Sequence, residues 1–335
     1  MILKNVALKP YNTFGLDYKA AWVATIANEN EAVSLCRDIH TFPSPLLLLG
    51  EGSNILFTGD FSGTVIRVNI DDITVEEKEG DDVIVSAGSG LRWDTFVEWC
   101  VNHGFYGLEN LSLIPGTVGA APVQNIGAYG TEVSETVTSV RTIDIKTGQI
   151  REFSSEECNF GYRTSVFKTS LKGRYLVLRV SFRLSRSFSP RTGYGNLAEE
   201  LEATGRYGPA DVRKAVIAIR RRKLPDPLVT GNAGSFFKNP VIDNIKASEM
   251  LSKNPGMPSF RDPSGNTKLA AGWLIEQCGW KGKRIGDAGV HDKQALVIVN
   301  YGNATGMELF ELSEKIRNSV YERFGIDLER EVEVV

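Results

Sequence analysis

The sequence contains one segment, residues 114–130, that is unusually rich in glycine, alanine and proline. Its sequence is IPGTVGAAPVQNIGAYG. Residues this small let a backbone come very close to a ligand or to another part of the chain. Thr117, Gln124 and Asn125 add side chains that form hydrogen bonds. The residues alone leave two interpretations open, a segment that binds a flat, extended ligand and a glycine-rich connecting loop.

A second glycine-containing motif, GEGSN at residues 50–54, directly follows an apolar run at residues 46–49. Successive backbone amides in such a turn can bind a phosphate. The motif lacks the third glycine of the dinucleotide-binding fingerprint, because Ile55 stands in its place. Considered alone, it is more typical of a tight turn than of a nucleotide-binding loop.

A third motif, GNAGSFFKNP at residues 231–240, places Ser235 after two glycines. It differs from the nucleophile elbow of hydrolases, because Phe237 occupies the position of that motif's second glycine. The sequence gives no convincing histidine partner for Ser235 in a catalytic triad. If Ser235 takes part in chemistry, we therefore expect it to donate a proton. The alternative is a serine that only caps a turn.

A dense run of positive charge, RRRK, occupies residues 220–223. It lies at the end of a helix that is predicted over residues 209–222. Pro209 and Asp211 are suited to the first turn of this helix, and Pro225 prevents it from continuing. The helix dipole favours Lys and Arg at such an end. The run is therefore either the basic end of a helix or a phosphate-binding patch.

Composition excludes several classes of protein. The chain has 335 residues, of which 42% are hydrophobic, with a net charge of −3 and a mean hydropathy of −0.15. No apolar run approaches the roughly 18 residues of a membrane-spanning helix, and the first residues lack the apolar core of a signal peptide. We therefore expect a cytoplasmic protein without membrane insertion. The charge balance also provides no field that would attract nucleic acid.

The cysteines and histidines are scattered along the sequence. No two of the cysteines, Cys36, Cys100, Cys158 and Cys278, form a CxxC motif. In a cytoplasmic chain this spacing indicates reduced, mostly buried thiols rather than disulfides. The three histidines do not have the spacing of zinc ligands, so we expect no metal site.

Hydrophobic periodicity predicts helices and strands that interleave without a regular βα repeat. Strands are predicted at residues 22–27, 46–49, 64–68, 83–87, 139–145, 149–153, 175–184, 295–299 and 329–335. Helices are predicted at residues 29–39, 93–101, 209–222, 269–278 and 308–324. The pattern indicates an α+β fold, with a βαβ unit at its start. We expect three regions, residues 1–70, 71–207 and 208–335.

Eight motifs together resemble those of one family, the UDP-N-acetylenolpyruvoylglucosamine reductases. They are GEGSN, IPGTVGAAPVQNIGAYG, FGYRTSVFK, RRRKLPDP, TGNAGSFFKNP, KLAAGWLIE, KQALVIVN and LEREV. They occur in the family's order, from about residue 12 to residue 332. The segment YGNL at residues 194–197 is similar to the long loop of the family's type I branch. Glu51 departs from the family pattern, in which this position is often glycine.

The resemblance implies a fold, a reaction and cofactors. The fold is an FAD-binding fold of the vanillyl-alcohol-oxidase type in two subdomains, followed by a C-terminal α+β substrate-binding domain. The reaction is the reduction of UDP-N-acetylglucosamine enolpyruvate to UDP-N-acetylmuramate in peptidoglycan synthesis, with NADPH as hydride donor. FAD is expected to be non-covalent, because neither glycine-rich segment contains a histidine. We expect a monomer that binds these small molecules.

The resemblance also assigns roles to individual residues. It implies that Ser235 donates the proton, that Arg163 binds the substrate carboxylate and that Glu331 polarises this carboxylate. The implied substrate-binding residues are Tyr194, Lys223, Asn239 and Gln294. The implied FAD-binding residues are Gly50, Glu51, Gly52, Ser53, Asn54, Pro115, Gly116, Thr117, Gly119, Ala120, Gln124, Asn125 and Gly127.

Two other functions remain compatible with the same fold. One is a flavin-dependent oxidase of alcohols or hydroxy acids, which would turn over with oxygen. The other is a protein that binds a nucleotide sugar or flavin without catalysis. The combination of Arg163, Ser235 and Glu331 argues against the oxidase, and the intact set of motifs favours the reductase over both.

Overall fold

The computed structural model describes residues 1–262 and 264–335. The chain forms two compact units, each assembled from separate stretches of sequence. Unit 1 comprises Met1–Val6, Lys19–Glu51 and Phe61–Arg222, and unit 2 comprises Ala7–Tyr18, Gly52–Asp60 and Lys223–Val335. The GEGSN motif is therefore divided, with Gly50 and Glu51 in unit 1 and the rest in unit 2. The three regions expected from the sequence stay a prediction.

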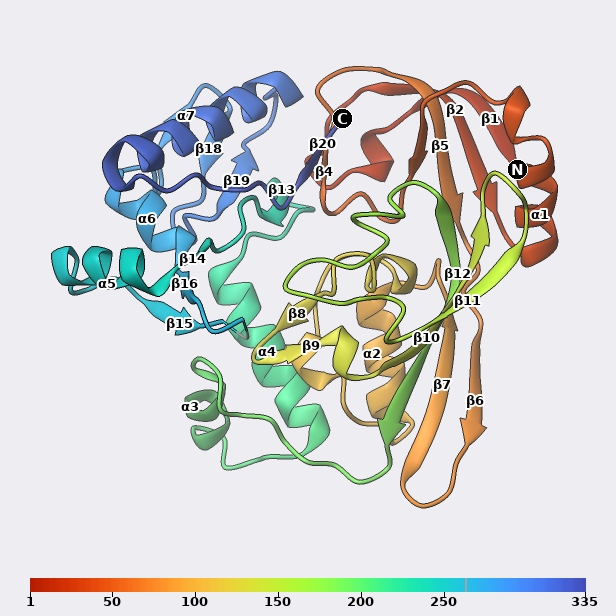
Figure 1. Ribbon diagram of the computed structural model, residues 1–335, viewed down its shortest axis with the longest axis horizontal. Coiled ribbons are helices and arrows are strands. Elements are labelled where there is room, and N and C mark those ends of the chain that lie inside the picture. Colours follow the sequence, from red (N-terminus) through yellow and green to blue (C-terminus); the bar gives the residue numbers. More distant parts are fainter. Residues whose placement is uncertain (263) are drawn as a thin grey trace. The chain divides into compact units, whose positions relative to one another are not determined.

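The first sheet of unit 1 contains the predicted βαβ unit (Figure 1). Its strands, in spatial order, are β1 (Ile2–Ala7), β2 (Lys19–Ile26), β5 (Phe61–Val68) and β3 (Leu46–Leu48). Strand β5 runs parallel to both β2 and β3. Helix α1 (Glu29–Arg37) begins where Asn28 Oδ1 accepts a hydrogen bond from Glu31 N. It buries Leu35 and Cys36 against this sheet.

The second sheet of unit 1 is antiparallel throughout. Its strands, in spatial order, are β11 (Ile150–Ser154), β10 (Val137–Asp144), β12 (Tyr175–Ser185), β7 (Asp82–Gly88) and β6 (Ile73–Glu77). Helix α2 (Trp93–Asn102) packs on it through Phe96, whose ring lies 5.0 Å from that of Phe182 in β12. A short hairpin, β8 (Gly127–Ala128) and β9 (Thr131–Glu132), follows the glycine-rich segment.

Two further helices complete unit 1 (Figure 1). They are α3 (Leu197–Glu202) and α4 (Pro209–Lys223). The last residue of α4, Lys223, is the first residue of the third stretch of unit 2. Leu197 and Leu201 of α3 share a buried cluster with Val212, Val216 and Ile219 of α4. As predicted, α4 starts at the proline and ends at the basic run.

The described residues of unit 2 form two sheets, a strand pair and three α-helices. Its four-stranded sheet has the order β13 (Gly231–Ser235), β19 (Val297–Asn300), β18 (Ala288–Val290) and β17 (Arg284–Ile285). A smaller sheet has the order β14 (Val241–Ile242), β16 (Thr267–Leu269) and β15 (Ser259–Arg261). The helices are α5 (Asn244–Lys253), α6 (Ala271–Gln277) and α7 (Gly306–Phe324). Phe14, Phe236, Leu274, Ile298 and Ile316 form part of its core.

The predicted strand at residues 329–335 is wrong in extent. Only Glu333–Val334 form a strand, β20, which runs parallel to β4 (Ile55–Leu56). Residues 329–331 face β13 and its extension, where Lys238 N donates to Glu329 O and Glu331 N donates to Phe236 O. The segment changes partners along its length, so no single alternating pattern describes it.

The thiol prediction is confirmed. All four cysteines are free, with Cys36, Cys100 and Cys158 buried and Cys278 half-buried. Burial raises the pKa of Cys36 to about 11 and that of Cys158 to about 12. These thiols are therefore unreactive at neutral pH. Among the helices that the structure describes, none combines the length and apolar character that crossing a bilayer requires.

The start of α7 gives a prediction about stability. A β-carbon on Gly306 would lie 1.7 Å from the carbonyl oxygen of Phe57. Gly306→Ala should therefore lower the free energy of unfolding by about 2–3 kcal/mol, although alanine favours helices intrinsically. Urea unfolding measures the change. Gly59→Ala is the control, because the space beside that glycine is open; equal losses in the two variants would contradict the steric argument.

Candidate functional site

The glycine-rich segment and the start of the GEGSN motif lie side by side in unit 1. A β-carbon on Gly50 would lie 3.0 Å from Thr117 Oγ1. Glu51 Oε2 accepts a hydrogen bond from Gly116 N at 3.0 Å, and Glu51 Oε1 pairs with Arg92 Nε at 2.8 Å. The residue that departs from the family pattern thus joins two segments expected to bind the same cofactor.

Backbone strain is concentrated around the glycine-rich segment. Of the non-glycine residues that the structure describes with positive φ, four belong to this region: Leu113 (57°), Asn125 (45°), Tyr129 (50°) and Arg163 (53°). Such conformations persist only where the surrounding structure holds them, and they cluster at functional sites. The segment therefore has a shape imposed by its neighbours, which favours the ligand-binding interpretation over a plain loop.

Arg163 contacts this segment through its guanidinium group. Nη2 donates to Gly127 O at 2.6 Å and Nη1 donates to Asn125 O at 3.4 Å. A β-carbon on Gly127 would lie 3.0 Å from Arg163 Nη1, so glycine gives the guanidinium room to approach. The structure thus brings one predicted catalytic residue against the predicted cofactor-binding segment, within one unit.

Asn125 maintains the shape of the segment from inside. Its buried side chain donates through Nδ2 to Glu132 Oε2 at 2.8 Å and to Gly161 O at 3.1 Å. Its Oδ1 accepts from Ser134 N at 3.0 Å. The predicted contacts of Asn125 and Gln124 with FAD stay predictions.

The residues beside the glycine-rich segment fit a polar cofactor such as FAD. Gly119 N donates to Ser89 O at 2.9 Å, and a β-carbon on Gly119 would lie 2.4 Å from Ser89 Cβ. Ser89 Oγ is buried and has no hydrogen-bond partner within the described part of the chain. Buried hydroxyl groups normally have a partner. A bound dinucleotide would supply such a partner to Ser89, whereas Gly119 is glycine because Ser89 packs against it.

Unit 2 holds the other two predicted catalytic residues, Ser235 and Glu331, both half-buried. Gly234 precedes Ser235 with φ 68° and has open space where a β-carbon would lie. The residue after Ser235, Phe236, accepts a hydrogen bond through its carbonyl from Glu331 N at 2.8 Å. The structure therefore brings the Ser235 strand and Glu331 together, although 95 positions separate Phe236 and Glu331 in the sequence.

The unit 2 part of the GEGSN motif adjoins Glu331. Asn54 Nδ2 donates to Glu331 O at 3.1 Å, and Glu333 N donates to Asn54 O at 3.1 Å. Gly52 has φ 67°, and a β-carbon there would lie 2.0 Å from Tyr11 O. Ser53 lies between them in the turn that precedes β4. The motif thus also holds the backbone of Glu331.

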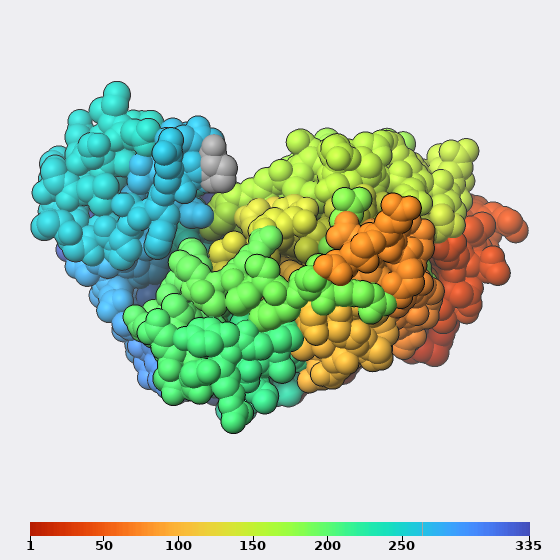
Figure 2. Space-filling view, turned by 90° about the horizontal axis from the view of Figure 1, so that it is seen from below, coloured from red at the N-terminus to blue at the C-terminus, as the bar shows by residue number. Residues whose placement is uncertain are grey.

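Of the four predicted substrate-binding residues, three belong to unit 2 and one belongs to unit 1. Asn239 and Gln294 lie together at the start of α6: Asn239 Oδ1 accepts from Ala271 N at 3.0 Å, and a β-carbon on Gly272 would lie 3.1 Å from Gln294 Oε1. Lys223 is exposed at the end of α4. Tyr194 belongs to unit 1, in the green segment between β12 and α3 that lies on the surface in Figure 2, and 48% of its surface is exposed.

The basic run at residues 220–223 consists of side chains with different surroundings. Arg220 Nε donates to Leu113 O at 3.2 Å, and Arg222 pairs with Glu200 of α3. Arg221 and Lys223 are exposed. Two members of the run therefore bind protein groups, which leaves the phosphate-binding interpretation to Arg221 and Lys223.

An ion pair between α2 and α4 was not predicted from the sequence. Arg213 Nη1 and Nη2 donate to Asp94 Oδ1 and Oδ2 at 2.6 and 3.1 Å. Only 9% of the Arg213 side chain is exposed. The available signal was a charged residue beside Val212 on the apolar face of a helix. Asp94 gave no such signal. An acidic residue in the first turn of a helix is already explained by its favourable interaction with the helix dipole.

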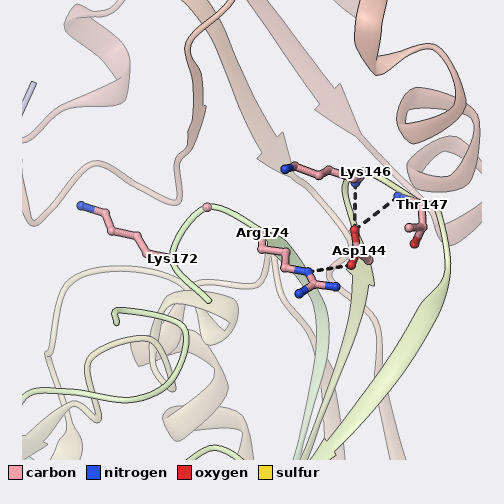
Figure 3. A pocket seen from close by; sticks show the side chains of 6 residues that line it. Asp144, Lys146, Thr147, Lys172 and Arg174 are labelled. Atoms are coloured by element: carbon pink, nitrogen blue, oxygen red, sulfur yellow. Dashed lines mark hydrogen bonds and ion pairs between the residues drawn. The ribbon is translucent and has the colours of Figure 1, made fainter. Parts of the chain in front are cut away.

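A basic hollow on unit 1 has none of the predicted site residues in its lining (Figure 3). It is lined by Asp144, Lys146, Thr147, Lys172 and Arg174. Asp144 accepts hydrogen bonds from Lys146 N at 2.9 Å and Thr147 N at 3.3 Å, and from Arg174 Nε at 2.9 Å. The carboxylate of Asp144 therefore already binds the backbone amides of the turn between β10 and β11. We interpret the hollow as the stabilised end of this hairpin.

Comparison with known proteins decides the family. Residues 226–335 match the UDP-N-acetylenolpyruvoylglucosamine reductase C-terminal domain, and residues 20–154 match an FAD binding domain. The reductase of Chromobacterium violaceum is 50% identical over 330 residues, which is 98% of this chain and 97% of that protein. The chain belongs to the UDP-N-acetylenolpyruvoylglucosamine reductase family.

Other relatives of the reductase family agree with this assignment. The reductase of Burkholderia pseudomallei is 48% identical over 334 residues, 98% of this chain and 96% of that protein. The crystal structure of the Thermus caldophilus reductase (MurB) is 27% identical, with a TM-score of 0.69 over 100% of this chain and 99% of that one. The expected α+β fold with an FAD-binding part is confirmed.

Proposed function

We propose that the protein reduces UDP-N-acetylglucosamine enolpyruvate to UDP-N-acetylmuramate, with NADPH as hydride donor and FAD as cofactor, in the synthesis of peptidoglycan precursors. The observation that carries this proposal is identity of 50% to a reductase over nearly the whole length of both chains. Arg163, Ser235 and Glu331, to which the motif resemblance assigns the catalytic roles, support the same reaction.

Arg163 is proposed to bind the carboxylate of the enolpyruvyl group. When bound, FAD carries the hydride from NADPH to this substrate. Negative charge then develops toward the carboxylate, where a fixed cation stabilises it strongly. A planar guanidinium matches a carboxylate with two parallel hydrogen bonds. The contacts of Arg163 with Gly127 O and Asn125 O support this role, because they fix the guanidinium beside the cofactor segment.

Ser235 is proposed to donate the proton to the carbon next to the one that receives the hydride. A serine hydroxyl is a weak acid in water, so this role requires a cation or a hydrogen-bond donor that stabilises the oxygen after it loses its proton. Ser235 is half-buried, and the bond from Glu331 N to Phe236 O places Glu331 on the neighbouring chain segment. Glu331 is proposed to polarise the substrate carboxylate.

Tyr194, Lys223, Asn239 and Gln294 are proposed to bind the UDP part of the substrate. Exposed Lys223 can pair with a phosphate, and Tyr194 supplies a hydroxyl from a surface segment. Asn239 and Gln294 contribute amide groups from the start of α6. A cytoplasmic location, a monomeric state and the absence of a metal site belong to the same proposal and stay predictions.

Anaerobic absorption spectroscopy tests the proposed reaction. Purified protein loaded with FAD should lose its flavin band on addition of NADPH and regain it on addition of UDP-N-acetylglucosamine enolpyruvate. Bleaching without recovery would keep a flavoenzyme but reject this substrate, and turnover of an alcohol with oxygen would indicate an oxidase. Binding of the UDP ligand without NADPH oxidation would indicate a non-catalytic protein.

A further inference from the structure

The glycine-rich segment begins after a strained residue that unit 1 holds from both sides. Leu113 has φ 57°. Its N–H donates to Asp94 Oδ1 at 2.6 Å, and its carbonyl accepts from Arg220 Nε at 3.2 Å. A residue with a β-carbon avoids this left-handed conformation. Hydrogen bonds at both ends of the residue therefore maintain a backbone that leucine would otherwise leave.

Asp94 is itself fixed by Arg213 of α4. The two side chains form a bidentate pair, with Nη1–Oδ1 and Nη2–Oδ2 distances of 2.6 and 3.1 Å. Burial alone would raise the pKa of Asp94, but hydrogen bonds from Arg213 and Leu113 outweigh it and hold the pKa below its ordinary value. Asp94 is therefore an ionised acceptor for Leu113 N at neutral pH, and its orientation is set by the planar guanidinium.

The segment between Leu113 and Tyr129 is held at both ends. Tyr129 also has a positive φ, 50°, and its carbonyl accepts a hydrogen bond from Asn110 Nδ2 at 2.9 Å. Pro115 and Gly116 follow Leu113 almost directly, and they are the first predicted cofactor-binding residues of the glycine-rich segment. A rotation at Leu113 would move every backbone group that follows it.

We propose that the Asp94–Arg213 pair is a positioning device for the cofactor: it keeps Leu113 in its left-handed conformation and so sets the shape in which residues 115–127 bind FAD. This inference rests on the proposed function. Asp94 and Arg213 act through Leu113 and have no part in the reaction itself. If only a fraction of the apoprotein keeps the competent shape, the apparent Kd for FAD rises by the inverse of that fraction.

Titration of the full-length apoprotein with FAD, followed by fluorescence, tests the proposal. Asp94→Asn and Arg213→Met should each raise the Kd about tenfold, and the double variant should bind about as weakly as either single variant, because both changes remove the same restraint. The control pair is Glu200→Gln and Arg222→Met, a more exposed ion pair that joins α3 to the same helix as Arg213, α4. These two changes should alter the Kd less than twofold.

Substitutions at Leu113 separate positioning from general stability. Leu113→Gly in the Asp94→Asn background should return the Kd to within about threefold of the wild-type value, because glycine adopts a positive φ without strain. Leu113→Ile, which leaves the ion pair intact, should weaken binding, because a β-branched residue resists this conformation. Leu113→Ile keeps the proposal testable even if an ion-pair variant fails to fold.

Three results would overturn the inference. The first is a Kd for FAD equal to that of the wild type in Leu113→Ile, or in Asp94→Asn or Arg213→Met when these variants are folded. The second is a weakened Asp94→Asn that Leu113→Gly does not restore, since that would indicate loss of general stability, visible also in the apoprotein's thermal unfolding. The third is a wild-type protein that does not bind FAD, which would overturn the proposed function as well; the first two leave that function intact.

Discussion

Ser235→Ala should nearly abolish reoxidation of the flavin by the enolpyruvyl substrate and leave its reduction by NADPH almost unchanged. General acid catalysis contributes about 10²–10⁴ in rate, and alanine removes the hydroxyl that is proposed to donate the proton. Reduction by NADPH needs no proton from Ser235, so its rate should stay within about twofold. Anaerobic stopped-flow absorbance measures the two half-reactions separately.

The control for this experiment is Ser259→Ala, which removes an exposed hydroxyl from β15 in the same unit. It should leave both half-reactions unchanged. Equal slowing of both half-reactions in Ser235→Ala would remove Ser235 from the role of proton donor. Such a result would instead indicate that the turn after Gly234 supports the whole site.

Arg163→Lys should slow reoxidation by the substrate by about 10²–10³, the usual loss when one stabilising donor of a developing anion is removed. Lysine keeps the charge but lacks the planar fork that binds a carboxylate at two points. It also lacks the reach to hold Gly127 O and Asn125 O together, as Arg163 does. Single-turnover kinetics at several substrate concentrations gives the effect on rate and on affinity.

Arg174→Lys is a suitable comparison for Arg163→Lys. Arg174 lies in the same unit, is half exposed and pairs with Asp144 at a hairpin end. It should behave like wild type in both half-reactions. An Arg163→Lys variant that reoxidises at the wild-type rate would show that the substrate carboxylate is bound elsewhere.

Much of the fold followed from local patterns. The strand predicted at 175–184 became β12 (Tyr175–Ser185), because strict alternation marks a strand with one buried face. Helix α4 begins at Pro209 as predicted. In contrast, β1 has almost only exposed residues, and β14 to β18 are two or three residues long. Neither an exposed edge strand nor so short a strand has a periodicity to detect.

The site depended on relations that local patterns do not contain. Ser235 and Glu331 were identified through the family resemblance, because the bond that joins their segments links residues far apart in the sequence. The Asp94–Arg213 pair spans 119 positions and was missed for the same reason. The motifs that contain Gly50 and Thr117 could each be recognised in the sequence. The contact between these two residues could not, because it depends on how the chain folds.

The parallel pairing of β4 with β20 has a consequence for synthesis of the protein. Ile55 pairs with Glu333, so unit 2 cannot complete its hydrogen bonding until residue 333 has left the ribosome. The early stretches of unit 2, Ala7–Tyr18 and Gly52–Asp60, must wait for Lys223–Val335, while every residue of unit 1 has already been made. Phe14, Leu16 and Leu56, which belong to the core of unit 2, stay without that core during this interval. Exposed apolar residues of this kind are what chaperones bind, and they leave the nascent chain vulnerable to aggregation until Lys223–Val335 has been made.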